Sequence, residues 1–157
     1  MNHDTIYLEE ASPTDAGMIA TMSRDYIESG LGWSWNEKRV LASIKRPNTQ
    51  VLKAFKGSEF AGFGIMTFGK LKANLNLLAV HPPFRRYGIG AEIVTALEDQ
   101  AVTLGQENFY VQVRESNQAA REFYRQFGYE MIDRNPRYYK NREAAVILYK
   151  YRPEGKS

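Results

Sequence analysis

The chain has 157 residues, 43% of them hydrophobic and 25% charged, a composition that suits one soluble globular domain with a sizeable core. It contains no cysteine, which excludes disulfides, thiolate metal sites and a cysteine nucleophile. The net charge of +3 arises from scattered basic pairs without a long basic run, so a nucleic-acid-binding function is disfavoured.

Membrane and metal partners are disfavoured as well. No apolar run is long enough to cross a bilayer, and the first residues lack the pattern of a signal peptide, so we expect a cytoplasmic protein. His3 and His81 are the only histidines, and no metal-ligand spacing is present. We therefore expect neither a membrane partner nor a bound metal.

The first half of the chain alternates between strand and helix patterns. Ser12 can cap a helix, and Pro13 suits its first position, while a glycine-rich break at residues 30–32 ends that helix. The expected elements are a strand over 5–9, a helix from 13, a second helix over 37–45, and strands over 50–56 and 60–68 around a tight turn at 57–59.

The second half predicts a strand–helix–strand unit, which implies a parallel strand pair with a right-handed crossover. The expected elements are strands over 75–80, 109–113, 129–133 and 144–150, and helices over 88–104 and 117–127. The fold class is therefore α/β (α+β): a mixed, largely antiparallel sheet flanked by about four helices. We expect a single domain over residues 1–157 with an ordered core at about 5–151.

The junction after the strand that ends at Val80 carries the clearest chemical signal. Arg85 and Arg86 precede a helix that begins through Gly88-x-Gly90. Glycines let the backbone approach a ligand closely, and a helix start presents unpaired N–H groups and a partial positive charge. This combination is typical of a site for phosphate or diphosphate.

Other interpretations of the glycines fit less well. A dinucleotide-binding fingerprint needs a third glycine, where this chain has Ile93, and a P-loop needs Gly-Lys-Ser/Thr. A purely structural role, in which the glycines only start a helix against a sheet, remains the alternative.

A second signature lies at the next predicted helix. Together with Arg85-x-x-Gly88-x-Gly90, it resembles the acetyl-CoA signatures of the GNAT superfamily of N-acetyltransferases, and the order of elements matches over nearly the whole chain. The second signature comprises Asn117, Ala120, Tyr124, Gly128 and Tyr129. The segments 113–117 and 137–139 are similar to those of N-terminal acetyltransferases that modify ribosomal proteins.

The resemblance implies that acetyl-CoA is the cosubstrate and assigns residues to it. A backbone N–H near Val80 would polarise the thioester carbonyl, and Tyr124 would be the general acid that protonates the leaving thiolate. Asn117 would steady the pantetheine arm or simply cap its helix, and Tyr124 would otherwise be a core aromatic. The implied coenzyme-binding residues are Leu78, Ala79, Val80, Arg85, Arg86, Tyr87, Gly88, Ile89, Gly90, Ala91, Asn117, Ala120 and Tyr124.

The general base and the acceptor site are less well defined. Gln112 stands where the ribosomal-type enzymes have a glutamate, and an amide cannot accept the proton. Glu28 and Glu37 are expected to be solvated helix charges rather than ligands for a cationic amine. The candidate acceptor wall comprises Tyr26, Trp33, Trp35, Gln112, Tyr138 and Tyr139, with core packing as the alternative for its aromatic members.

The sequence thus predicts an acetyl-CoA-dependent N-acetyltransferase, monomeric or homodimeric, that acts on a primary amine of a protein N-terminus or a small molecule. The absence of cysteine favours direct attack in a ternary complex over an acetyl-cysteine intermediate. The alternative is a coenzyme A-binding regulatory module without catalysis, for which Gln112 is the main support.

Overall fold

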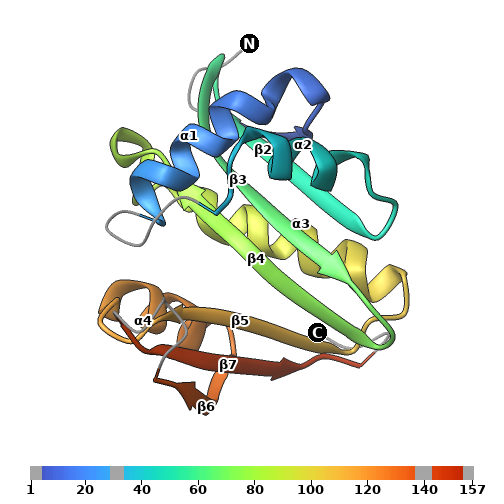
Figure 1. The fold of residues 1–157 in the computed structure, drawn as a ribbon, viewed down its shortest axis with the longest axis vertical. Helices are drawn as coiled ribbons and strands as arrows, with labels where there is room; N and C mark the ends of the chain where they lie inside the picture. The colour runs from blue at the N-terminus through green and yellow to red at the C-terminus, as the bar shows by residue number, and fades with distance from the viewer. Residues whose placement is uncertain (1–4, 29–33, 137–142, 154–157) are drawn as a thin grey trace. The chain divides into compact units, whose positions relative to one another are not determined.

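A computed structural model describes residues 5–28, 34–136 and 143–153. Within them, seven strands form one hydrogen-bonded sheet in the order β1-β2-β3-β4-β5-β7-β6, with four α-helices (Figure 1). The predicted mixed, largely antiparallel sheet is confirmed, and β4 and β5 form the expected parallel pair. The strands are β1 (Ile6–Glu10), β2 (Thr49–Lys56), β3 (Glu59–Phe68), β4 (Lys72–Val80), β5 (Asn108–Arg114), β6 (Glu130–Asn135) and β7 (Ala145–Tyr151). The helices are α1 (Ala16–Tyr26), α2 (Glu37–Lys45), α3 (Ile89–Thr103) and α4 (Gln118–Gln126), with short 3-10 turns at Pro13–Asp15 and Pro82–Phe84.

The chain groups into two compact units. The first comprises Met1–Thr67 with Asn76–Gln100, and the second comprises Phe68–Leu75 with Ala101–Ser157. The division falls within β4 and near the end of α3. In the described part of the chain, no helix is both long enough and apolar enough to span a membrane.

In the first unit, helices cover both faces of strand β3. Phe63 and Ile65 point into a buried cluster with Ile19 of α1 and Val40 of α2. On the other face, α3 (yellow in Figure 1) approaches so closely that a Cβ at Gly64 would lie 2.6 Å from Ile93 Cγ2. Successive residues of β3 therefore face α1 and α2 on one side and α3 on the other. The strand lies in the middle of three layers in this unit.

Short polar contacts fix the start of the first two helices. The Ser12 amide donates to Asp15 Oδ2 at 2.7 Å, and Lys53 Nζ of β2 donates to the same oxygen at 2.8 Å. Burial alone raises the pKa of the Asp15 carboxyl, but the hydrogen bonds from Lys53 and Ser12 outweigh it and hold the pKa below its usual value. Asn36 Oδ1 accepts from the Arg39 amide at 3.0 Å and thereby caps the N-terminus of α2.

The second unit is built from β5, β7 and β6 with helix α4 and the first part of β4. The parallel ladder joins Lys72–Leu75 to Asn108–Val111. Asn117 caps α4, and Gly128 ends it with φ +95°, a left-handed conformation that glycine adopts without strain.

Two expected details differ in the structure. Strand β4 begins at Lys72 rather than 75, because parallel pairing with β5 holds its polar first residues in the sheet. Leu104, the last residue of the helix predicted over 88–104, lies outside α3 and is 54% exposed. Helix α3 ends at Thr103, and the turn through Gly105 (φ +89°) carries Leu104 away from the buried face.

Alanine at Gly62 will destabilise the protein, because the added Cβ would lie 2.5 Å from the backbone oxygen of Ala79 on the neighbouring strand. We expect Gly62→Ala to lower the free energy of unfolding by about 1–3 kcal/mol in urea titrations. The matched control is Gly17→Ala in α1, whose Cβ would meet only Glu37 Oε1 at 3.5 Å. That variant will stabilise the protein by up to about 1 kcal/mol, since alanine favours helix; equal effects of the two substitutions would contradict the close β3–β4 contact.

Candidate functional site

The junction between β4 and α3 turns through two residues with left-handed backbone. After the 3-10 turn at Pro82–Phe84 and Arg85, Arg86 has φ +70° and Gly88 has φ +77°. A left-handed arginine is strained, whereas glycine adopts this conformation freely. The pair redirects the chain so that α3 starts at Ile89, whose side chain is buried at 1% exposure and anchors the helix in the core.

At this junction, the backbone amides of Phe84 and Arg85 donate hydrogen bonds within the described chain, whereas the amides at the start of α3 do not. The Phe84 and Arg85 amides donate to the oxygens of His81 and Pro82 at 2.8 and 3.2 Å. The ladder of α3 then begins with the Glu92 amide donating to Gly88 O at 3.0 Å. The amides of residues 88–91 therefore precede the ladder, as at every helix start, and are available to an anion together with the helix dipole.

Space and charge at this junction fit a diphosphate. A Cβ built on Gly88 meets nothing within 4 Å, so the backbone lies open to a ligand there. Arg86 and Tyr87 are exposed, and Lys56 Nζ lies 4.5 Å from the centre of the Tyr87 ring. Arg85 Nε donates to Val80 O at 3.1 Å, which positions its guanidinium beside the end of the strand. The residues expected to hold the coenzyme diphosphate, including Gly90 and Ala91 in the first turn of α3, are thus contiguous.

The last residues of β4 lie beyond its parallel ladder. Among the described residues, the pairing of β4 with β5 is confined to Lys72–Leu75. Leu78 and Val80 are half-buried, and Ala79 is buried at 6% exposure. A strand edge without its ladder offers N–H and C=O groups to an extended ligand arm, which is the role expected for Leu78, Ala79 and Val80.

Aromatic side chains gather where β4 ends. Tyr26 Oη and His81 Nδ1 share a hydrogen bond of 2.6 Å between the end of α1 and the end of β4. The His81 and Phe84 ring centroids lie 5.9 Å apart, and the Arg85 guanidinium lies 5.8 Å from the Tyr26 ring centroid. Tyr26, expected in an acceptor wall or in the core, is half-buried with its hydroxyl on this histidine.

In the second unit, Tyr124 is buried in an aromatic cluster. It is 5% exposed, and the rings of Phe123 and Tyr129 lie 5.0 and 5.5 Å from it. Burial raises the pKa of the Tyr124 hydroxyl well above its usual value, so the phenol keeps its proton at neutral pH.

The remaining expected residues lie partly within and partly outside the described ranges. Asn117 Oδ1 accepts from the Ala120 amide at 3.0 Å, which confirms its role as a helix cap and leaves the other end of its amide group for a ligand. Gln112 is exposed on β5 between two buried valines. Trp35 is half-buried under the Arg39 guanidinium, 3.8 Å from the ring centre. Trp33, Tyr138 and Tyr139 lie outside the described residues.

The expectation that Glu28 is a solvated charge is wrong. Glu28 is only 9% exposed and accepts hydrogen bonds from the Ser23 hydroxyl at 3.0 Å and the Ser34 amide at 2.8 Å. The Trp35 amide adds a third donor at 3.1 Å. The carboxylate therefore joins α1 to the segment before α2. The serines on both sides of the glycine-rich break are the sequence signal that was available for this role.

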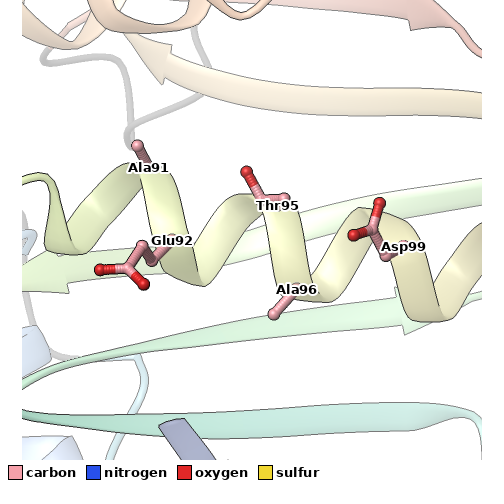
Figure 2. Close-up of a pocket in the computed structure, with 5 residues that line it drawn as sticks. All are labelled: Ala91, Glu92, Thr95, Ala96 and Asp99. Atoms are coloured by element: carbon pink, nitrogen blue, oxygen red, sulfur yellow. The ribbon is translucent and has the colours of Figure 1, made fainter. Parts of the chain in front are cut away.

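A shallow pocket on the outer side of α3 is chemically different. Figure 2 shows its lining side chains, which come from one helix: Ala91, Glu92, Thr95, Ala96 and Asp99. Its two carboxylates would repel a phosphate, so this surface suits a diphosphate less well than the junction does. Over the described ranges, no group of three or more His, Cys, Asp or Glu side chains gathers as metal ligands.

Comparison with known proteins identifies the family to which the chain belongs. The pattern of the acetyltransferase (GNAT) family matches residues 18–129, more than half of the chain. The ribosomal protein bS18-alanine N-acetyltransferase of Haemophilus ducreyi is 34% identical over 84 residues, which cover 51% of this chain and 58% of that protein. The chain spans 51%, 38% and 58% of the lengths of three curated relatives that it matches.

Two solved structures share the fold. The ribosomal-protein-S18-alanine N-acetyltransferase from Escherichia coli has a TM-score of 0.79 at 23% identity, covering 98% of this chain and 96% of its own. The PaiA N-acetyltransferase from Thermoplasma acidophilum, solved in complex with coenzyme A, has a TM-score of 0.79 at 20% identity, covering 94% of this chain and 99% of its own. At these identities, the similarity establishes the fold.

Leucine at Gly88 will separate ligand binding from folding. We expect Gly88→Leu to weaken coenzyme A binding at least about tenfold in calorimetric titrations, because the side chain fills the space in front of the amides. Gly105→Leu is the matched control, since Gly105 is also left-handed with nothing within 4 Å. Both variants will lose about 1–2 kcal/mol of stability through backbone strain, and only the first will lose affinity. Unchanged affinity in Gly88→Leu would remove the diphosphate from this junction.

Proposed function

The chain belongs to the acetyltransferase (GNAT) family, and from that premise we propose that it transfers the acetyl group of acetyl-CoA to a primary amine. The observation that carries the proposal is the junction of β4 and α3, where open amides, Gly88 and two arginines gather. A structural role for the glycines alone would not require the space in front of Gly88 or the exposed arginine beside it.

The residues of the junction would hold the cosubstrate. The backbone of Leu78, Ala79 and Val80 would pair with the pantetheine arm, and the amides from Arg86 to Ala91 would bind the diphosphate with help from Arg85 and Arg86. When bound, acetyl-CoA supplies an activated acyl group with a thiolate as the leaving group.

Two residues would act on the reacting group. The Val80 N–H would donate to the thioester carbonyl and stabilise the negative charge that develops on its oxygen. Tyr124 would donate its proton to the departing thiolate, and a buried phenol that stays protonated suits this role. Asn117 would steady the arm through the amide group that its capping bond leaves free. Since the chain has no cysteine, the amine would attack directly.

The acceptor is proposed to be the α-amine of a peptide or protein N-terminus, with a small-molecule amine as the alternative. The support is the likeness to enzymes whose names state that they acetylate the alanine of a ribosomal protein. An α-amine, with a pKa of about 8 against about 10.4 for lysine, is also easier to deprotonate near neutral pH.

A coenzyme A-binding module without catalysis is the second candidate. The amide of Gln112 in place of a carboxylate favours it, whereas a buried, protonated Tyr124 favours catalysis. One experiment separates them: acetyl-CoA is titrated by calorimetry, and thiol release is then measured with peptide N-termini, polyamines, amino acids and aminoglycosides. Binding without thiol release supports the module, and absence of binding contradicts both.

Phenylalanine at Tyr124 will lower turnover without weakening the cosubstrate complex. Loss of a positioned acid costs about 10²–10⁴-fold in kcat, while the ring packing against Phe123 and Tyr129 is kept. The measurement is kcat by thiol release alongside the Kd for acetyl-CoA, with Tyr151→Phe at an exposed tyrosine of β7 as control. An unchanged kcat would exclude Tyr124 as the acid.

A further inference from the structure

We propose that Tyr26 and His81 form the proton relay that deprotonates the acceptor amine. The inference rests on the proposed function and supplies the base that Gln112 cannot provide. It concerns residues of one compact unit, the same unit that carries the diphosphate junction.

Two carboxylates close in sequence to the expected acceptor residues, Glu28 and Glu115, are already engaged. Glu28 accepts from the Ser23 hydroxyl and from the Ser34 and Trp35 amides, so its lone pairs are occupied. Glu115, which follows β5, is paired with Arg134 through two hydrogen bonds, one of them 2.9 Å long. These contacts engage both carboxylates in structural roles, so we do not assign either of them as the base.

The Tyr26–His81 pair has the geometry of a relay. Its oxygen and nitrogen lie 2.6 Å apart, a short hydrogen bond along which a proton can pass. Both side chains are half-buried, so they are held in place while part of the pair stays accessible. The His81 amide donates to Ala61 O at 2.7 Å, which fixes the backbone from which the imidazole projects. Imidazole is the side chain best suited to take up a proton near neutral pH.

The surroundings of the pair support the transfer. His81 directly follows Val80, whose N–H is proposed to polarise the thioester carbonyl. Arg85 is bonded to Val80 O, and its guanidinium faces the Tyr26 ring at 5.8 Å. Phe84, whose ring lies 5.9 Å from the imidazole, adds no charge beside it.

The step balances in atoms and electrons. The ammonium first passes one proton to Tyr26 Oη, while the proton of Tyr26 passes to His81 Nδ1, and the neutral amine nitrogen then bonds to the thioester carbon. The carbon–sulfur bond breaks, the thiolate takes the proton of Tyr124, and the nitrogen passes its second proton to solvent. The amide and free coenzyme A leave, after which solvent returns one proton to Tyr124 and accepts one from His81.

A purely structural tie between α1 and β4 is the competing explanation, and His81→Asn distinguishes the two. Asparagine places an amide near the position of Nδ1, so it keeps a hydrogen bond to Tyr26 but cannot take the proton. We expect His81→Asn to keep its melting temperature and its affinity for acetyl-CoA, and to lose about 10²–10⁴-fold in kcat at about pH 7. The deficit will narrow towards about pH 9.5, where the α-amine is already neutral. Tyr26→Phe will behave likewise, and Tyr7→Phe on β1 is the matched control.

A second readout does not depend on turnover. In the relay, the Nδ1 atom of His81 accepts from Tyr26, so nitrogen NMR at about pH 8 will show Nδ1 unprotonated and Nε2 protonated. A proton on Nδ1 in the resting protein overturns the relay, as does wild-type kcat with an unchanged pH profile in His81→Asn. If the wild type itself shows no turnover on any amine, the proposed function fails and the relay fails with it, so the two failures are told apart.

Discussion

The unused hydrogen-bonding capacity of one strand end is the constraint on which the site depends. Strand β4 keeps its parallel partner only over Lys72–Leu75 and then continues to Val80. Backbone groups that a sheet does not pair must find other partners, and the amides at the start of α3 face the same requirement. One continuous stretch of backbone therefore offers donors and acceptors first to an extended arm and then to an anion. A ligand with an extended arm at one end and a diphosphate in its middle would satisfy both the strand end and the helix start.

Glycines shape this backbone for opposite purposes. Gly62 and Gly64 of β3 let the strand approach β4 and α3 more closely than any Cβ would allow, which makes the support beneath the junction rigid. Gly88 has empty space around it, which leaves its backbone open to the proposed ligand. Arg86 adopts a strained left-handed conformation in the same junction. Strained residues of this kind are common in functional loops.

Local patterns in the sequence predicted the helices and strands, but they did not predict contacts between residues far apart in the chain. Helix α2 was predicted residue for residue because Asn36 caps it and Pro47 follows it. The start of β4 was missed because its pairing, not its composition, places Lys72 in the sheet. The resemblance to the ribosomal-type enzymes singled out position 112, whereas the bond between Tyr26 and His81 joins residues 55 positions apart and leaves no periodic pattern in the sequence. The burial of Glu28 was hidden for the same reason, since its donors come from both sides of a loop.

The proposed acid and the proposed base belong to different compact units. Tyr124, the proposed acid, lies in the unit with Gln112, whereas Tyr26 and His81 lie in the unit with the diphosphate junction. The proposed base directly follows Val80 and shares the backbone bonds that shape the junction, so the proposed relay needs no carboxylate on β5. An amide at position 112 is then compatible with the proposed catalysis.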